Sequence, residues 1–136
     1  MAVSTAAISF ASKDDIPVLA QIITEGHGPE AVMAFFFKDW PATTTMLPLM
    51  TSRISMKFAD PNTKVIKITD DATKEILGLT AITLETGDKA AERDISSISN
   101  ANSTPLPGMN WEFATEVITK MKTLDELMVG KKHYGA

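Results

Sequence analysis

The chain has 136 residues, of which 44% are hydrophobic and 22% charged, and it contains no cysteine. These values are ordinary for one globular domain with a core of its own. The absence of cysteine excludes disulfides, thiolate nucleophiles and cysteine-based zinc sites. The net charge of −4 argues against a nucleic-acid partner, because phosphate binding requires a basic surface.

The N-terminal stretch MAVSTAAISF has no basic start and no long apolar core, so we predict no signal peptide. No apolar run reaches the roughly 20 residues that a membrane span needs. Lysines and arginines are scattered, which predicts no polybasic membrane patch. The sequence therefore predicts a cytoplasmic protein with neither a membrane nor a nucleic acid as its partner.

The first part of the chain predicts one strand and three helices. The AISF segment is short, apolar and β-prone, and Ser12 follows it as a helix N-cap with Asp15 at the capping-box position. Residues 29–40, PEAVMAFFFKDW, predict a second, short helix, which three consecutive phenylalanines would bury on more than one side. A third helix is expected to start near Leu47 and cannot continue past Pro61.

The hydrophobic period then changes from helical to alternating. The KVIKITD segment places Ile66 and Ile68 on one face of a strand and Lys67 on the other. Residues 75–85, EILGLTAITLE, predict a longer strand that pairs with the first as an antiparallel hairpin. Gly78 within this strand indicates a bulge or a close backbone approach.

The remainder predicts a flexible polar loop at residues 86–110, an amphipathic helix over 109–130, and a short final strand at 131–136. Asn110 is the expected N-cap of this helix, and Gly130 its end. Taken together, the elements predict an α+β fold, with a small antiparallel sheet packed with about four helices. We treat residues 1–136 as a single domain.

Three stretches of the chain, taken in order, resemble a known family. ISFASKDDIPVLAQIITEGH, VIKITDDATKEILGLTAITLE and the closing GKKHYGA look like the N-terminal half of a GCN5-related N-acetyltransferase (GNAT), in the style common in filamentous fungi. The resemblance covers nearly the whole chain. It implies a partial GNAT-like fold in which KKHYGA opens the fourth strand of the sheet.

The chain lacks the motif that binds the coenzyme in this family. In the family, a glycine-rich loop and a helix N-terminus follow the fourth strand, and their amides hold the pyrophosphate of acetyl-CoA. The seven glycines of this chain are spread out, and none falls in a Q/R-x-x-G-x-G/A pattern. We therefore expect no cofactor, and acetyl-CoA only if the chain is a truncation, with the coenzyme site just beyond the last residue.

Three residues are candidates for acid–base catalysis. His27 follows the first helix between two glycines, and an unshifted imidazole titrates near neutral pH. His133 and Tyr134 lie on the expected last strand, where they would form a proton-transfer pair facing a pocket. The structural alternatives are a polar loop residue for His27 and strand-edge packing for the other two. Two histidines this far apart make no metal motif, so no metal is expected.

Aromatic and methionine side chains gather on three predicted helices, where they form either plain core or the wall of an apolar pocket. In the family, the first two helices and their connection line the acceptor side, so the resemblance points to residues 27–40. Asp39 and Glu112 adjoin the two tryptophans. An acid in such a place either has a raised pKa, if the apolar ring desolvates it, or is simply solvated. The candidates for substrate binding are Phe36, Trp40, Met50 and Trp111.

Three functions remain open. The leading one is a GNAT-derived protein without a coenzyme A site, which binds an apolar small molecule or transforms it by acid–base or templated isomerisation or cyclisation. The second is a truncated acetyl-CoA-dependent N-acetyltransferase. The third is a non-catalytic interaction protein.

An apolar strand edge invites pairing with another strand. Six residues at 131–136 cover only part of the strand at 76–85. We therefore expect a homodimer built through these two segments.

Overall fold

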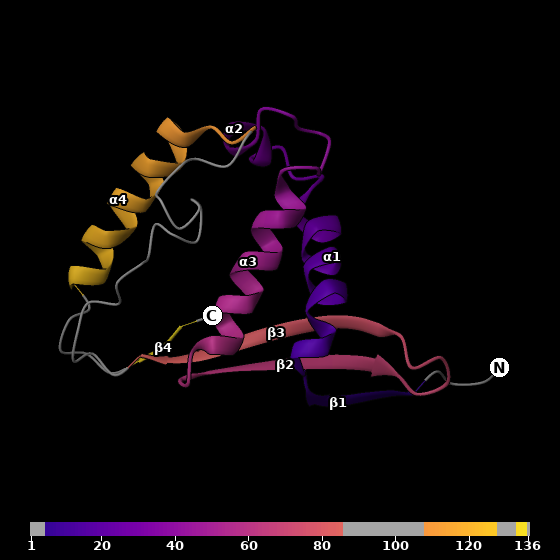
Figure 1. Cartoon of the computed structure of the whole chain (residues 1–136). Helices are drawn as coiled ribbons and strands as arrows, with labels where there is room; N and C mark the ends of the chain where they lie inside the picture. The colour runs from indigo at the N-terminus through magenta and orange to yellow at the C-terminus, as the bar shows by residue number, and fades with distance from the viewer. Residues whose placement is uncertain (1–4, 86–107, 128–132, 136) are drawn as a thin grey trace.

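The computed structural model describes residues 5–85, 108–127 and 133–135 (Figure 1). They form an α+β fold, which confirms the predicted class, with four α-helices and an antiparallel sheet among the described residues. The elements, in chain order, are β1 (Ala6–Phe10), the 3-10 helix η1 (Lys13–Asp15), α1 (Ile16–His27), α2 (Met33–Phe36), α3 (Met46–Ala59), β2 (Thr63–Asp70), β3 (Ile76–Glu85), α4 (Trp111–Leu127) and β4 (His133–Gly135).

The sheet has the strand order β1-β2-β3-β4, and each neighbouring pair is antiparallel. The hairpin of β2 and β3 contains a bulge, because Ile68 lies opposite Gly78 whereas Thr69 lies opposite Ile76. Leu77 is the extra residue, which confirms the irregularity predicted from Gly78. The short β4 pairs only with the last three residues of β3, at 83–85.

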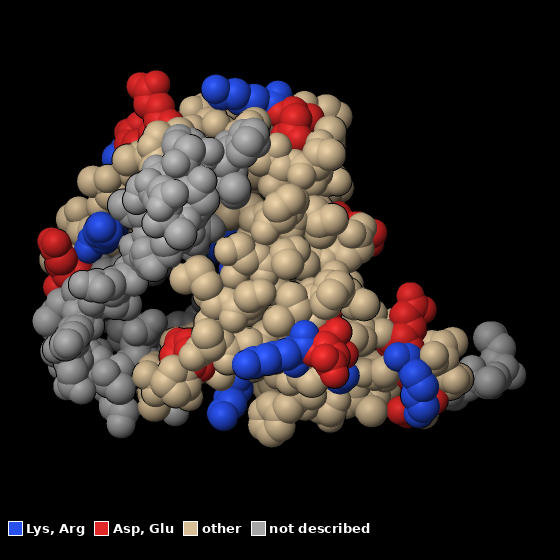
Figure 2. All heavy atoms as spheres, viewed as in Figure 1, with Lys and Arg blue, Asp and Glu red and all other residues tan. Residues whose placement is uncertain are grey.

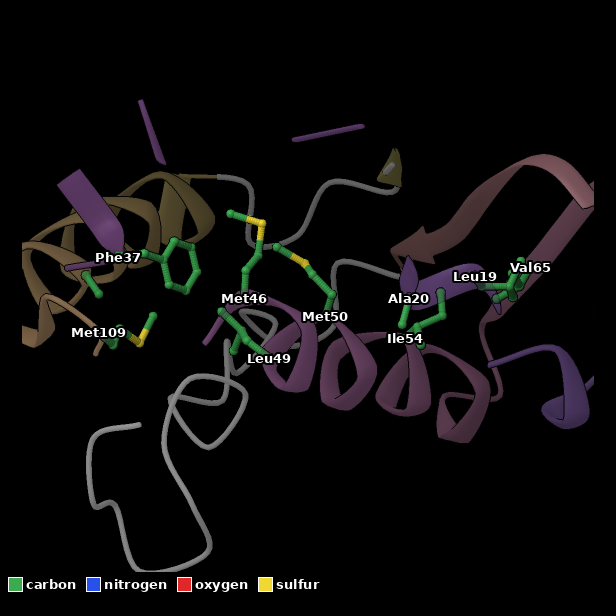
Figure 3. Close-up of a cluster of buried hydrophobic side chains, with 10 residues drawn as sticks. Leu19, Ala20, Phe37, Met46, Leu49, Met50, Ile54, Val65 and Met109 are labelled. Carbon is green, nitrogen blue, oxygen red and sulfur yellow. The ribbon is translucent and has the colours of Figure 1, made fainter. Parts of the chain in front are cut away.

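Helices α1 and α3 pack on one face of the sheet, and no described element lies on the other (Figure 1). The core runs along α3 (Figure 3). At one end, Leu19 of α1 and Ile54 of α3 pack over Val65 of β2. At the other end, Phe37 lies beside Met109. The core therefore joins the sheet to the remote end of the molecule, where α2 and α4 meet.

The covered face of the sheet carries a lysine. Val65 is 5% exposed on this face, and Lys67 lies two residues further along β2 and on the same side. The Lys67 ammonium donates to Asp15 Oδ2 at 2.8 Å, and the Ser12 N–H donates to the same oxygen, also at 2.8 Å. The capping acid predicted from the sequence thus also ties the start of α1 to β2.

The short helix expected within residues 29–40 is present as Met33–Phe36. It ends before Phe37, which is extended, with φ −123° and ψ 117°, and forms an antiparallel bridge with Met109. The three phenylalanines differ in burial, since Phe37 is 3% exposed and Phe35 is 59% exposed. The expectation that this segment is buried on more than one side was therefore wrong, because Phe35 faces solvent.

The loop expected at 86–110 lies mostly outside the described residues. Its last three residues are described, and they form a turn, the bridge at Met109 and the residue before α4.

The Asp15 carboxyl predicts a pH-dependent contribution to stability. Hydrogen bonding to Lys67, followed by that to the Ser12 backbone, holds the pKa of Asp15 below its ordinary value of 3.8. Because the folded-state pKa is depressed, the contribution is present above pH 3.8 and is lost as the pH falls through the folded-state value. We expect Asp15→Asn to lower the free energy of unfolding at neutral pH by about 1 kcal/mol.

Urea denaturation across the acidic range measures this effect, and the deficit of Asp15→Asn should shrink at low pH. Asp14→Asn is the matched control, because Asp14 occupies the same turn and is exposed. Equal stabilities of the two variants at neutral pH would contradict the role assigned to Asp15.

Candidate functional site

The candidate site lies at the end of the molecule where α1 ends and where α2, the start of α3 and the start of α4 come together; we call it the α2 end (Figure 1). The Trp40 indole N–H donates to the carbonyl oxygen of Gly28 at 2.9 Å. Gly28 directly follows His27, the last residue of α1. This single bond therefore brings the segment after α2 against the end of α1.

Two backbone hydrogen bonds fasten α4 to α2. The Lys38 N–H donates to Gly108 O at 2.6 Å, and the Asn110 N–H donates to Phe36 O at 2.7 Å. Asn110 also caps α4 as predicted, since its side-chain oxygen accepts from the Phe113 N–H at 3.4 Å, a long contact. The start of α4 is thus positioned by backbone contacts to residues far away in the sequence.

Gly108 occupies a position that suits only glycine. Its φ is +81°, and a Cβ added there would collide with the Thr45 hydroxyl. Gly108 packs closely against Thr45 at the start of α3, and its carbonyl oxygen accepts from the Lys38 N–H, just after α2. These contacts place the residues before α4 against both α2 and the start of α3. The sequence held no local signal for this role, since Gly108 was one of seven dispersed glycines.

An aromatic cluster bridges α2 and α4. The Phe36 ring meets the Phe113 ring edge-on at 4.9 Å between centroids, and the Phe35 ring lies 5.6 Å from Phe113 at a tilt of 33°. Such pairs contribute roughly 0.5–1.5 kcal/mol beyond their burial. Phe36 packs on the core, whereas Phe35 remains exposed, so the cluster has one buried side and one open side.

His27 forms a pair with Glu30. Nδ1 of His27 lies 3.0 Å from Glu30 Oε1, and the two side chains are 53% and 50% exposed. A carboxylate at Nδ1 orients the imidazole, while Nε2 is left to exchange a proton with a ligand. His27 was a candidate from the sequence and Glu30 was not, although a spacing of three residues across a turn was a readable signal.

Asp39 is held at the start of α3. Its Oδ2 accepts from Thr44 Oγ1 at 2.9 Å, from Thr45 Oγ1 at 3.1 Å and from the Thr45 N–H at 3.2 Å. Burial raises the pKa of Asp39, but these hydrogen bonds together outweigh it and leave the pKa below its usual range. The raised pKa that the sequence left open for Asp39 is therefore absent, because three donors converge on one oxygen.

The other oxygen, Asp39 Oδ1, is buried and has no hydrogen-bond partner among the described residues. Buried polar atoms without a partner are uncommon and call for a physical explanation. This oxygen is an acceptor beside Trp40 that a donor group could satisfy.

The structure brings some of the predicted site residues together and separates others. Phe36, Trp40 and Trp111 lie at the α2 end, partly buried against the core, and His27 lies beside them at the end of α1. Met50 is 8% exposed within the core on α3 (Figure 3).

The remaining two candidates, His133 and Tyr134, belong to β4, which lies across the molecule from α2 (Figure 1). Their side chains are outside the described part of the structure. The three catalytic candidates are therefore not gathered in one site, and His27 has Glu30 as its described polar partner.

Comparison with family models, with curated proteins and with solved structures found no match. Within residues 5–85, 108–127 and 133–135, no cluster of histidine, aspartate and glutamate could hold a metal ion. No helix in these ranges is long and apolar enough to cross a membrane. On the face shown in Figure 2, acidic and basic residues lie interspersed around the rim of a broad uncharged area.

Replacing Gly108 tests the junction between α2 and α4. Gly108→Ala should lower the free energy of unfolding by about 1–3 kcal/mol, because alanine must adopt a positive φ and also displace Thr45. Thermal denaturation followed by circular dichroism measures the loss.

Gly26→Ala is the control. A Cβ at Gly26 meets nothing within 4 Å and Gly26 lies within α1, so alanine should leave stability unchanged or raise it slightly. If the Gly108→Ala protein is as stable as the parent, the junction accepts a side chain at this position, and the requirement for glycine is contradicted.

Proposed function

We propose that the chain is a GNAT-derived protein that binds an apolar small molecule at the α2 end and uses His27 for proton transfer. The observation that carries the proposal is the hydrogen bond from Trp40 to Gly28, which joins an aromatic ring to the residue after His27. An apolar surface next to an orientable acid–base group is the usual composition of a small-molecule site.

The topology supports the GNAT part of the proposal. Helices lie between the first two strands, the sheet is antiparallel in sequence order, and β4 adds at its edge next to β3. This arrangement agrees with the fold that the resemblance implies, in which the first helices and their connection line the acceptor side. We also propose a cytoplasmic location, which agrees with a chain that lacks cysteine.

The proposed chemistry follows from the pairing of His27 and Glu30. In the neutral imidazole, the Nδ1 hydrogen is donated to Glu30, and the lone pair on Nε2 accepts a proton from the ligand. The resulting imidazolium keeps its hydrogen bond to Glu30 and can return the proton to another ligand atom, which constitutes an isomerisation. Because both side chains are half exposed, the pair is accessible to a ligand.

Asp39 Oδ1 narrows the class of ligand. It is a buried acceptor on the residue before Trp40, so the best match is an apolar molecule that carries one hydroxyl or amine hydrogen. We expect such a donor to add specificity. A ligand without a donor leaves the buried acceptor without a hydrogen bond and therefore binds with lower affinity.

Tryptophan fluorescence tests binding directly, because the two tryptophans of the chain, Trp40 and Trp111, both lie at the α2 end. We expect anilinonaphthalene sulfonate, an apolar probe, to quench this emission in a saturable manner. Trp40→Phe should weaken binding about tenfold, because it removes the bond to Gly28 while keeping a ring, whereas His27→Gln should leave binding nearly unchanged.

Leu77→Glu is the matched control for this titration, since Leu77 is an exposed apolar residue on β3, away from the α2 end. Equal loss in Leu77→Glu and Trp40→Phe would show that the probe binds exposed apolar surface in general. That result would contradict a site at the α2 end.

The truncated acetyltransferase is the second candidate, favoured by the strand order of the sheet. Calorimetric titration with acetyl-CoA separates the two, and we expect no binding at micromolar concentrations, because no glycine-rich loop is present in the sequence. A micromolar dissociation constant would overturn the first candidate in favour of the second.

A further inference from the structure

The bare face of the sheet is more apolar than the covered one. Side chains alternate along a strand, so the face opposite Val65 and Lys67 carries Ile66 and Ile68. On β1, Ile8 lies opposite Ile68 and Phe10 lies opposite Ile66. We call these four residues, Ile8, Phe10, Ile66 and Ile68, the isoleucine face.

The isoleucine face is strongly exposed. Ile8 is 75% exposed, Phe10 71% and Ile68 40%, and no described element packs over them (Figure 1). A one-sided antiparallel sheet normally turns its apolar residues to the core and its polar residues to solvent. Here a lysine is covered, whereas Ile8, Phe10 and Ile68 are exposed and Ile66 is half-buried, so this face has the composition of a buried surface.

The charges at the ends of this face are opposite in sign. Along β2 the residues on this side are Lys64, Ile66, Ile68 and Asp70, in that order. The row has a basic end, an apolar middle and an acidic end. When a second copy of the row runs in the opposite direction, its acidic end faces the basic end of the first. The row therefore selects a partner of the same chemistry running in the opposite direction.

We propose that the isoleucine face binds the same face of a second copy of this chain, with a two-fold axis crossing β2 near Lys67. This axis runs the two β2 strands antiparallel and sets Lys64 over Asp70 of the second copy at both ends. Ile66 then lies over Ile68 of the second copy, and Phe10 over Ile8 of the second copy. A two-fold axis along the strands would instead stack Lys64 on Lys64, so charge selects the first arrangement.

This dimer differs from one formed through the sheet edge at 76–85 and 131–136. An edge dimer extends the sheet by backbone pairing and leaves the isoleucine face bare. The face dimer buries side chains and leaves the edge unchanged. Variants on each surface therefore discriminate between the two.

Sedimentation velocity on the full chain tests the proposal. We expect a species with twice the 14.7 kDa mass of one chain, in concentration-dependent equilibrium with the monomer. Ile68→Glu and, separately, Phe10→Glu should each raise the dimer dissociation constant about tenfold or more, because each copy then brings a carboxylate into the apolar contact. Leu124→Glu, at a residue 62% exposed on α4, is the matched control and should leave the constant unchanged.

Charge reversal tests the orientation. Lys64→Glu should weaken the dimer, since it meets Asp70 of the second copy, and the loss should diminish in high salt. Adding Asp70→Asn should recover part of it, because the amide oxygen still accepts from the N–H groups of Ala72 and Thr73 that Asp70 binds at 2.8 Å. Circular dichroism establishes that each variant is folded.

A monomer at all concentrations would overturn the proposal. So would a dimer that withstands Ile68→Glu and Phe10→Glu but dissociates when residues 131–136 are deleted, since that dimer forms through the edge. These outcomes are independent of the binding titration at the α2 end, which reads Trp40 and Trp111.

Discussion

The ion pair between Lys67 and Asp15 fastens the start of α1 to the covered face of the sheet. A lysine beneath helices must have a partner, because an unpaired ammonium loses its hydration without compensation. Asp15 supplies the partner from the first turn before α1 and also accepts from Ser12, so one carboxylate starts the helix and anchors it to β2. On the same face, Leu19 of α1 and Ile54 of α3 bury Val65 of β2, and Ile66 and Ile68 lie on the other side.

The α2 end is joined to the sheet through α1 and α3. Its own order comes from contacts between distant segments: backbone pairing of α2 with the residues before α4, the Trp40 bond to Gly28, and the convergence of Thr44 and Thr45 on Asp39. The two proposed surfaces are thus separated along the length of the core (Figure 3). A ligand at one and a second chain at the other engage different elements, so each can be altered without disturbing the other.

The two surfaces also differ in chemistry. The α2 end combines a partly exposed aromatic cluster, a histidine oriented by a carboxylate, and a carboxylate oxygen that has no partner among the described residues, which suits a small ligand with few polar atoms. The isoleucine face is apolar and flanked by opposite charges. An apolar sheet face packs against another extended surface, because a small molecule would leave most of such a face in water.

The sequence by itself determined the elements whose signals are local. The capping box at Ser12 and Asp15, the alternation in β2, the bulge at Gly78 and the α+β class all follow from neighbouring residues, and the structure contains each of them. His27, Phe36, Trp40 and Trp111 were likewise identified from the sequence and lie at one end, whereas Met50 lies within the core. Local backbone preference and hydrophobic period act within a few residues, so one chain segment suffices to read them.

Only the tertiary structure decided the rest. Phe37 leaves its helix for a bridge with Met109, Gly108 meets Thr45, and Asp39 acquires a lowered pKa from the hydroxyl and amide groups around it. Alternation in β2 specified two faces but not which of them α1 and α3 would cover, because that depends on contacts of distant residues such as Leu19 and Ile54 with Val65. Contacts between segments far apart in the chain leave no trace in a local pattern, so their energies appear only when the fold has brought the segments together.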